Sequence, residues 1–201
     1  MAGIVRGVII LPLIVALIVW GRNRSRKVRS LGALAIIAIV VVIELFPVEN
    51  LFVTFPDVSS ACEYLGAGKI RTVVEGNETV YVETIKDDYR SSQVHILQKD
   101  DQGIKLRGSL LGRKIIRNEV LISGGNAKYW VIISKIAGSN DYYVNISSID
   151  LEKLSIKDAY NTVFVQTEWQ EEGPRYDYAG FIYDLSLPYT VEIDGVGYFV
   201  E

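Results

Sequence analysis

The sequence predicts a membrane protein in which a two-helix transmembrane hairpin is followed by an all-β soluble domain. Residues 7–21 and 31–46 form two long apolar runs, and a short basic loop over residues 22–29 connects them. The rest of the chain alternates apolar and polar residues between short turn sequences, a pattern typical of half-buried strands. The expected organisation is therefore a hairpin over residues 1–46, a linker with a short helix over residues 47–68, and a β-rich domain over residues 69–201.

Both apolar runs reach the length of a membrane span once their flanks are counted, since about 20 apolar residues cross a bilayer core as a helix. The first run extends from Ala2 to Trp20 and the second covers Val28–Pro47. Arg6 lies near one helix end, where its charge can extend to the lipid headgroups. Pro12 is expected to kink the first helix, and Trp20 ends it where an interfacial aromatic residue belongs.

Two other interpretations of the apolar runs fit less well. A cleaved signal peptide needs small residues at its cleavage site, and the sequence from Leu17 to Arg22 offers none. A pair of helices buried in a soluble core would keep one polar face, and neither run has one across its centre. The membrane hairpin is therefore preferred.

Charge predicts the orientation of this hairpin. The segment after the second helix contains several acids before its first base, Lys69, whereas the connecting loop has no acid. By the positive-inside rule, the loop stays in the cytoplasm and the carboxyl-terminal domain lies on the extracytoplasmic side of a cell membrane. The loop bases are Arg22, Arg24, Arg26, Lys27 and Arg29, and the acids are Glu44, Glu49, Asp57 and Glu63.

A short helix over residues 57–64 and five β-hairpins are expected after the membrane segment. Asp57 or Ser59 is the expected N-cap of the helix. Five hairpins in series predict an antiparallel meander that closes as a sandwich or barrel, or curls as a bent sheet. Residues 114–122 fit either a strand or a connector. The paired strands are 70–75 with 79–85, 93–98 with 104–107, 129–136 with 142–147, 163–169 with 178–183, and 189–193 with 198–200.

Composition excludes several classes of function. Residues 1–46 hold six Lys and Arg against one acid, whereas the remaining 155 residues hold fifteen against twenty-three. An acidic domain is a poor nucleic-acid binder, because that affinity depends on Lys and Arg at the phosphates. One His and one Cys do not make a zinc site, and one Cys forms no intramolecular disulfide. The acidic turns at residues 87–88 and 100–103 fit solvated turns better than calcium loops.

The sequence assigns no catalytic, cofactor-binding or metal-binding residue. Cys62 could pair only with His95, the single His of the sequence, and no Gly-x-Ser-x-Gly or Ser-x-x-Lys motif occurs in the β-rich domain. Paired carboxylates near aromatic rings favour glycoside hydrolysis, although sequence spacing does not fix the separation that this chemistry needs. The candidate acids are Glu168, Glu171 and Asp177, and the nearby rings are Trp169 and Tyr176.

Two compositional features are typical of binding surfaces, and each has a structural alternative. One is a set of tyrosines, which strands also favour. The other is a basic stretch that fits either an anionic polymer or a solvated face. The tyrosines are Tyr176, Tyr178, Tyr183, Tyr189 and Tyr198, and the bases are Lys105, Arg107, Arg113, Lys114 and Arg117.

The segment FPDVSSACEY at residues 55–64, followed by Gly68-Lys69-Ile70 and Val73-Val74-Glu75-Gly76, resembles small uncharacterised membrane-anchored proteins of Gram-positive bacteria. The resemblance covers about 25 residues and implies an exported β-rich domain on a membrane tether, with no stated activity. Those proteins usually have one helix or a lipid anchor, so two helices are a departure.

The expected function is that of a non-enzymatic binding or accessory domain anchored in the cell membrane. Its expected partners are the lipid bilayer together with a membrane protein or a cell-wall polymer, with no cofactor and no nucleic acid. One alternative is a surface hydrolase of wall polymers. Another reverses the topology and makes the β-rich domain a cytosolic regulatory module of a membrane complex.

Overall fold

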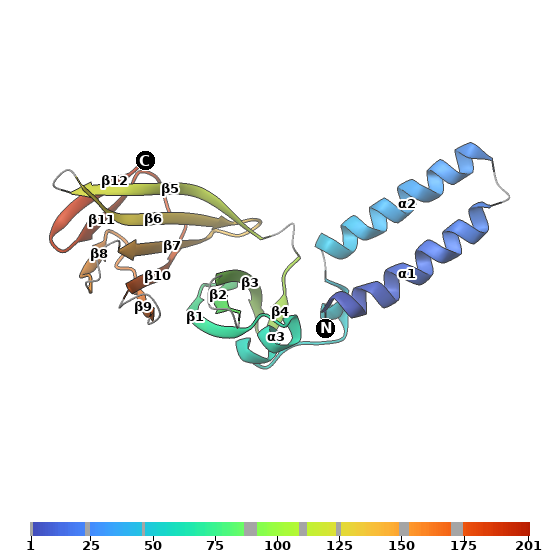
Figure 1. The fold of residues 1–201 in the computed structure, drawn as a ribbon, viewed down its shortest axis with the longest axis horizontal. Helices are drawn as coiled ribbons and strands as arrows, with labels where there is room; N and C mark the ends of the chain where they lie inside the picture. The colour runs from blue at the N-terminus through green and yellow to red at the C-terminus, as the bar shows by residue number, and fades with distance from the viewer. Residues whose placement is uncertain are drawn as a thin grey trace.

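The computed structural model describes residues 2–22, 25–45, 47–86, 92–108, 112–123, 126–148, 153–169 and 175–201. A helical hairpin projects from one side of a β-rich body, as Figure 1 shows. The body consists of two parts. The first β unit comprises the residues from 47 to 106, and the second β unit comprises those from 113 to 201.

Helices α1 (Ala2–Gly21) and α2 (Arg26–Leu45) form the hairpin and lie side by side in Figure 1. The two predicted helices are therefore confirmed as secondary structure, although α2 begins at Arg26, inside the segment expected as a loop over residues 22–29. Residues 23–24 of that segment lie outside the described residues. Gly32 lies at the contact between them, because a Cβ atom added there would be 3.5 Å from Cδ2 of Leu17. A residue without a side chain at this point lets α2 approach α1 closely.

Within the residues that the structure describes, no helix has both the length and the apolarity needed to cross a membrane. The described residues therefore do not support the transmembrane part of the predicted hairpin. Many side chains of α1 lie outside the described set.

The first β unit has one antiparallel sheet covered by a short helix. Its described strands are ordered β1-β2-β3-β4. Helix α3 contributes Ala61 and Cys62 to a core that also contains Val80, Val82 and Leu97. The strands are β1 (Lys69–Glu75), β2 (Thr79–Ile85), β3 (Ser92–Asp100) and β4 (Gly103–Leu106), and the helix is α3 (Val58–Leu65).

The termini of α3 follow from its sequence. Asp57 is the N-cap, and its side chain accepts a hydrogen bond of 2.7 Å from the backbone N–H of Ser60. This bond lowers the pKa of Asp57, since the carboxylate form accepts it. Gly66 ends the helix in the left-handed conformation, with φ of 64°, which glycine adopts without strain. The expected short helix is confirmed, and Asp57 rather than Ser59 is its cap.

Residues 47–68, expected as a linker, are part of the first β unit. The 3₁₀-helix η1 (Val48–Leu51) precedes a bridge between Phe55 and Ile104. The Asn50 amide donates to the Leu106 carbonyl at 2.7 Å and accepts from the Leu106 N–H at 2.9 Å. These bonds join the start of the segment to β4, so the hairpin connects to a folded unit.

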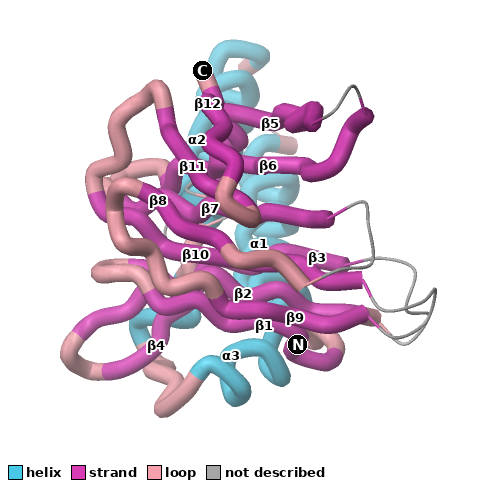
Figure 2. The backbone as a smooth tube through the Cα atoms, turned by 90° about the vertical axis from the view of Figure 1, so that its left-hand side faces the viewer, coloured by secondary structure: helices cyan, strands magenta, loops and turns pink. Residues whose placement is uncertain are grey.

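The second β unit consists of two sheets that share one core. In the described residues, one sheet has the order β5-β6-β7-β10-β9 and the other the order β12-β11-β8. Figure 2 shows the smaller sheet crossing in front of the larger one. Val131 and Val144 of the larger sheet lie in the same core as Val191 and Ile193 of the smaller. The strands are β5 (Arg113–Ser123), β6 (Asn126–Ile136), β7 (Asp141–Ser148), β8 (Ile156–Asp158), β9 (Val165–Trp169), β10 (Arg175–Tyr183), β11 (Tyr189–Ile193) and β12 (Val196–Val200).

All five expected hairpins are confirmed as antiparallel pairs. Residues 114–122, which fitted either a strand or a connector, belong to strand β5. The expected all-β, antiparallel domain is confirmed, but its described strands do not follow one another in a single sheet: they divide among three sheets, and β10 lies between β7 and β9. Strand β8 was not anticipated, since three residues are too few to display a period.

Candidate functional site

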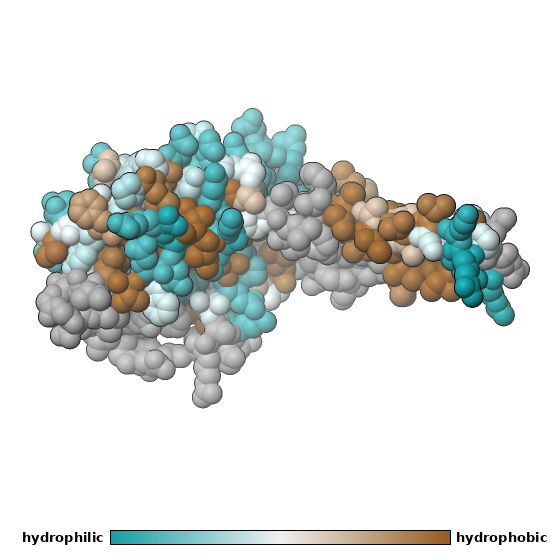
Figure 3. Space-filling model, turned by 90° about the horizontal axis from the view of Figure 1, so that it is seen from above, coloured by the Kyte–Doolittle hydropathy of each residue, from teal (hydrophilic) through white to brown (hydrophobic). Residues whose placement is uncertain are grey.

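The hairpin exposes many large apolar side chains among the residues that the structure describes. Ten large apolar side chains on its two helices are each more than half exposed, and Figure 3 shows them as a brown surface over the hairpin. A soluble protein rarely leaves a contiguous apolar patch of this kind uncovered. The ten residues are Val8, Leu11, Val15, Ile18, Val19, Trp20, Leu31, Leu34, Ile37 and Val42.

The two ends of the hairpin differ in chemistry. The end with the connection carries the basic residues of the first turn of α2, visible as the teal end in Figure 3. At the other end, Leu51 at the end of η1 and Phe52 directly after it are 78% and 82% exposed. The hairpin therefore has an apolar middle, a cationic end and an apolar margin next to the first β unit.

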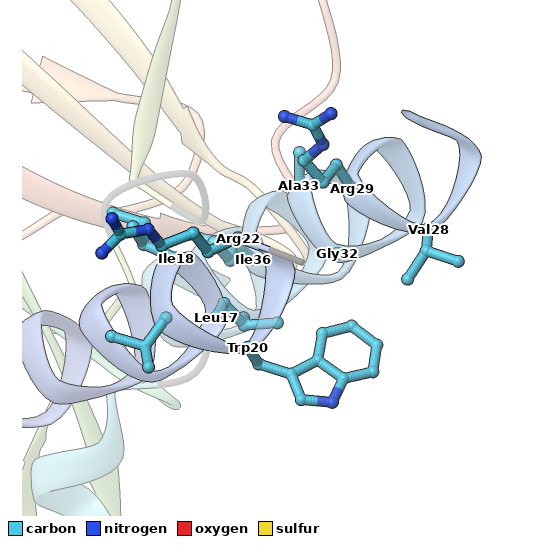
Figure 4. A pocket seen from close by; sticks show the side chains of 10 residues that line it. Leu17, Ile18, Trp20, Arg22, Val28, Arg29, Gly32, Ala33 and Ile36 are labelled. Carbon is cyan, nitrogen blue, oxygen red and sulfur yellow. The ribbon is translucent and has the colours of Figure 1, made fainter. Parts of the chain in front are cut away.

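A pocket of about 500 Å³ opens between α1 and α2 near the cationic end. Its wall is mostly apolar and includes Leu17, Ile18 and Ile36, with the small residues Gly32 and Ala33 between the helices. Arg22 and Arg29 also line it, and Figure 4 shows the Trp20 indole projecting away from both guanidinium groups. Within the described residues, neither of these guanidinium groups makes a hydrogen bond or an ion pair. The site therefore combines an apolar groove with two available cations.

Asp177, a candidate acid for glycoside hydrolysis, instead neutralises a buried cation. Arg71 on β1 donates to Glu83 on β2 at 3.0 Å and to Asp177 on β10 at 2.7 Å. The three side chains are only 5%, 13% and 19% exposed. Burial lowers the pKa of Arg71, and the two carboxylates oppose that effect. This network joins the two β units and gives Asp177 a structural role.

Of the other residues proposed for glycoside hydrolysis, only Tyr176 has a side chain that the structure describes. The backbone of Glu168 lies on β9 opposite Tyr176, but its side chain and that of Trp169 lie outside the described residues. Glu171 lies outside them as well. The carboxylate that the described residues place near Asp177 is that of Glu83, and Arg71 binds both.

Cys62 and His95 lie on the same side of the first sheet without forming a dyad. His95 pairs with Val82, whose side chain packs in the core that contains Cys62. No hydrogen bond joins the two residues in the part of the chain described, and the buried Nε2 of His95 has no partner there. Burial raises the pKa of the Cys62 thiol, which disfavours the nucleophilic thiolate.

The described residues contain no cluster of three or more His, Cys, Asp or Glu side chains for a metal ion. Asp100 accepts a hydrogen bond of 2.9 Å from the Gln102 N–H and one of 2.5 Å from Nζ of Lys105. These bonds make residues 100–103 a self-contained turn. The acidic pair at residues 87–88 lies outside the described part of the chain.

Several of the tyrosines and one residue of the basic stretch have structural contacts. Tyr178, Tyr189 and Tyr198 are buried in the core of the second β unit, whereas Tyr183 is exposed. Arg107 turns inward and donates to Gln98 and to the Ala137 carbonyl. The structural alternative therefore accounts for the three buried tyrosines and for Arg107.

Sequence reasoning missed a polar cluster between the two β units. Asp141 is fully buried and accepts hydrogen bonds from the backbone N–H and the hydroxyl of Thr79 at 3.0 and 2.6 Å. The Tyr143 hydroxyl, also buried, lies 2.9 Å from the Thr79 hydroxyl. The sequence carries no signal for this cluster, because Asp141 follows a turn where a solvated aspartate is the ordinary expectation.

Comparison with known proteins adds no family or relative. No protein-family model, no curated protein and no solved structure matches this chain. The resemblance to membrane-anchored proteins of Gram-positive bacteria therefore stays a prediction. The functional argument depends on the residues of the chain alone.

Proposed function

We propose that this chain is anchored in a cell membrane by its helical hairpin, as a transmembrane hairpin, and that its β-rich body is an extracytoplasmic binding or accessory module. The exposed apolar surface of α1 and α2 carries this proposal. The two long apolar runs of the sequence, which include side chains outside the described set, support it as well.

Exposing these apolar side chains to water costs free energy, so we expect lipid or another molecule to cover them. Burying one large aliphatic side chain is worth about 1.5–3 kcal/mol. The exposed residues of both helices together are therefore worth on the order of 10 kcal/mol or more when covered. This free energy is as large as the whole free energy of unfolding of a typical domain.

Lipid suits this cover better than a partner protein. The exposed residues occupy both helices rather than one stripe, whereas a protein partner would need only one face. Trp20 and the basic first turn of α2 lie at the same end, which is the arrangement found at a membrane interface. Leu51 and Phe52 add an apolar margin at the opposite end.

The extracytoplasmic placement of the β-rich body follows from the positive-inside rule. The connection between the helices carries the basic residues, and the β-rich body begins directly after α2. With the connection in the cytoplasm, both termini lie on the outer side. The reverse placement would make the body a cytosolic regulatory module.

A two-position labelling experiment tests the proposal. Cys62 is buried, so the native thiol is silent in the folded protein. Ser25 and Asp101 are exposed, one in the connection and one in the β3–β4 turn, and each is replaced by Cys in the full chain. Intact cells are treated with a membrane-impermeant maleimide, and lysed cells serve as the control.

The proposal requires that Asp101→Cys is labelled in intact cells and that Ser25→Cys is labelled only after lysis. Labelling of Ser25→Cys alone would contradict the extracytoplasmic placement and support the cytosolic module. Labelling of both positions in intact cells, or of neither, would contradict a hairpin that crosses the membrane with its connection inside. The hydrolase alternative is not proposed, because Asp177 is bound to Arg71.

A further inference from the structure

We propose that the pocket between α1 and α2 binds an anionic phospholipid of the surrounding bilayer, with an acyl chain against the apolar wall and the headgroup phosphate at Arg22 and Arg29. This inference rests on the proposed membrane anchoring. It adds a specific lipid site to a hairpin that would otherwise contact lipids without selection.

The apolar part of the pocket has the form that an acyl chain needs. Leu17 and Ile18 of α1 and Ile36 of α2 supply branched walls, while Gly32 and Ala33 leave space between the helices. A Cβ atom added at Gly32 would only just reach Leu17, so a larger side chain there would fill the groove. The space of about 500 Å³ is lined by residues between 17 and 22 and between 28 and 36, next to the connection of the two helices.

The cationic part of the pocket is matched to a phosphate group. A guanidinium group is planar and always charged, and its N–H groups pair with two phosphate oxygens at once. Arg22 follows the end of α1 and Arg29 lies in the first turn of α2, and both residues line the pocket. Figure 4 shows their guanidinium groups at separate points on its rim, so a headgroup reaches both only by extending between them. Basic pockets between membrane helices on the cytoplasmic side are where anionic headgroups bind.

Diffuse attraction is the competing explanation. Any basic connection attracts an anionic surface, whether or not it forms a site. Arg26 and Lys27 belong to the same stretch and are exposed, but they do not line the pocket. Replacing them therefore removes the same charge as replacing Arg22 and Arg29, without touching the proposed site.

Fluorescence quenching measures this site directly, because Trp20 lies at the pocket. The full chain is reconstituted in phosphatidylcholine vesicles that contain a small fraction of brominated phosphatidylglycerol or the same fraction of brominated phosphatidylcholine. A Trp20→Phe chain supplies the background from Trp130 and Trp169. We expect phosphatidylglycerol to be preferred at Trp20 roughly fivefold, which corresponds to about 1 kcal/mol in exchange free energy.

Two further variants decide between a site and diffuse attraction. The Arg22→Gln/Arg29→Gln chain should lose the preference, and the Arg26→Gln/Lys27→Gln chain should keep most of it. Gly32→Leu should also reduce it, although no charge changes. Equal quenching by the two lipids in the unaltered chain, or equal loss in both charge variants, would overturn the site. If vesicles made wholly of brominated phosphatidylcholine fail to quench Trp20, the membrane anchoring itself is wrong.

Discussion

At the scale of single residues, the two β units are joined by buried charge. Arg71 lies between Glu83 and Asp177, and its side chain is only 5% exposed. Arg71→Met would leave two carboxylates together in a partly buried place. We expect it to lower the free energy of unfolding by about 3 kcal/mol, as removing one partner of a buried ion pair does. Urea unfolding of the full chain in a mild detergent, followed by circular dichroism, measures the loss.

A surface ion pair provides the matched control for Arg71. Lys99 pairs with Glu75 at 2.5 Å, but the two side chains are 40% and 61% exposed. Lys99→Met should change the free energy of unfolding by less than about 1 kcal/mol, because water screens exposed pairs. Equal losses from Arg71→Met and Lys99→Met would show that burial does not distinguish the two networks.

His95 gives the stability of the first β unit a dependence on pH. Burial lowers its pKa below the ordinary value of 6.5, and the charge of Lys86 acts in the same direction. The unfolded chain therefore binds the proton more readily than the folded chain, and stability is lost as pH falls below about 6.5. Between about pH 7.5 and pH 5, His95→Leu should lose less stability than the unaltered chain. Parallel pH profiles for the two chains would exclude His95 as the source.

At the scale of elements, Gly180 shows how closely β10 approaches its neighbours. A Cβ atom there would meet Thr162 Cγ2 and lie 2.9 Å from Phe164 Cδ1. Thr162 is held by hydrogen bonds to Asp158, so it does not move away easily. Gly180→Ala should therefore lower the free energy of unfolding by about 1–3 kcal/mol.

Gly197 offers the comparison for Gly180 on another strand. A Cβ atom added at Gly197 would meet nothing within 4 Å, and its backbone does not need the left-handed conformation. Gly197→Ala should change stability by no more than about 0.5 kcal/mol, and it can raise it by restricting the unfolded chain. Thermal unfolding of the two variants side by side separates close packing from a general effect of glycine in strands.

The elements that the sequence predicted are those with local signals. Each of the five hairpins has a turn between two alternating runs, and α3 has a capping aspartate and a terminal glycine. The division into three sheets was not predictable, because partners such as β7 and β10 are far apart in the chain. Strand β8 lacks a period of its own and is defined by pairing with β11.

The candidate site divides in the same way. The apolar runs and the basic connection were evident from the sequence, because helical membrane segments are recognised by composition. The pocket was not, since it depends on how Gly32 and Leu17 bring the helices together. Asp177 has the sequence neighbours expected of a catalytic acid. Only the fold shows that Arg71, 106 residues away in the chain, binds it.

At the scale of the whole molecule, the hairpin and the β-rich body have opposite surfaces. The body buries most of its large apolar side chains in one core within each β unit and in a third core that the two units share. The hairpin exposes most of the large apolar side chains that the structure describes in it. If this surface alone makes the chain associate, removing residues 1–46 should leave a monomer that needs no detergent.

The truncated chain should also keep its fold, because its new amino terminus is held in place. Asn50 remains bonded to Leu106, and Phe55 remains bridged to Ile104. We therefore expect far-UV circular dichroism typical of β-sheet and a monomer mass by light scattering, whereas the full chain without detergent should elute as large aggregates.

Leu51 and Phe52 stay exposed after truncation, so the Phe52→Ser substitution should reduce any association that remains in the truncated chain. Aggregation of the truncated chain to the same extent as the full chain would mean that the β-rich body has its own association surface, and the hairpin would no longer explain the behaviour of the whole protein.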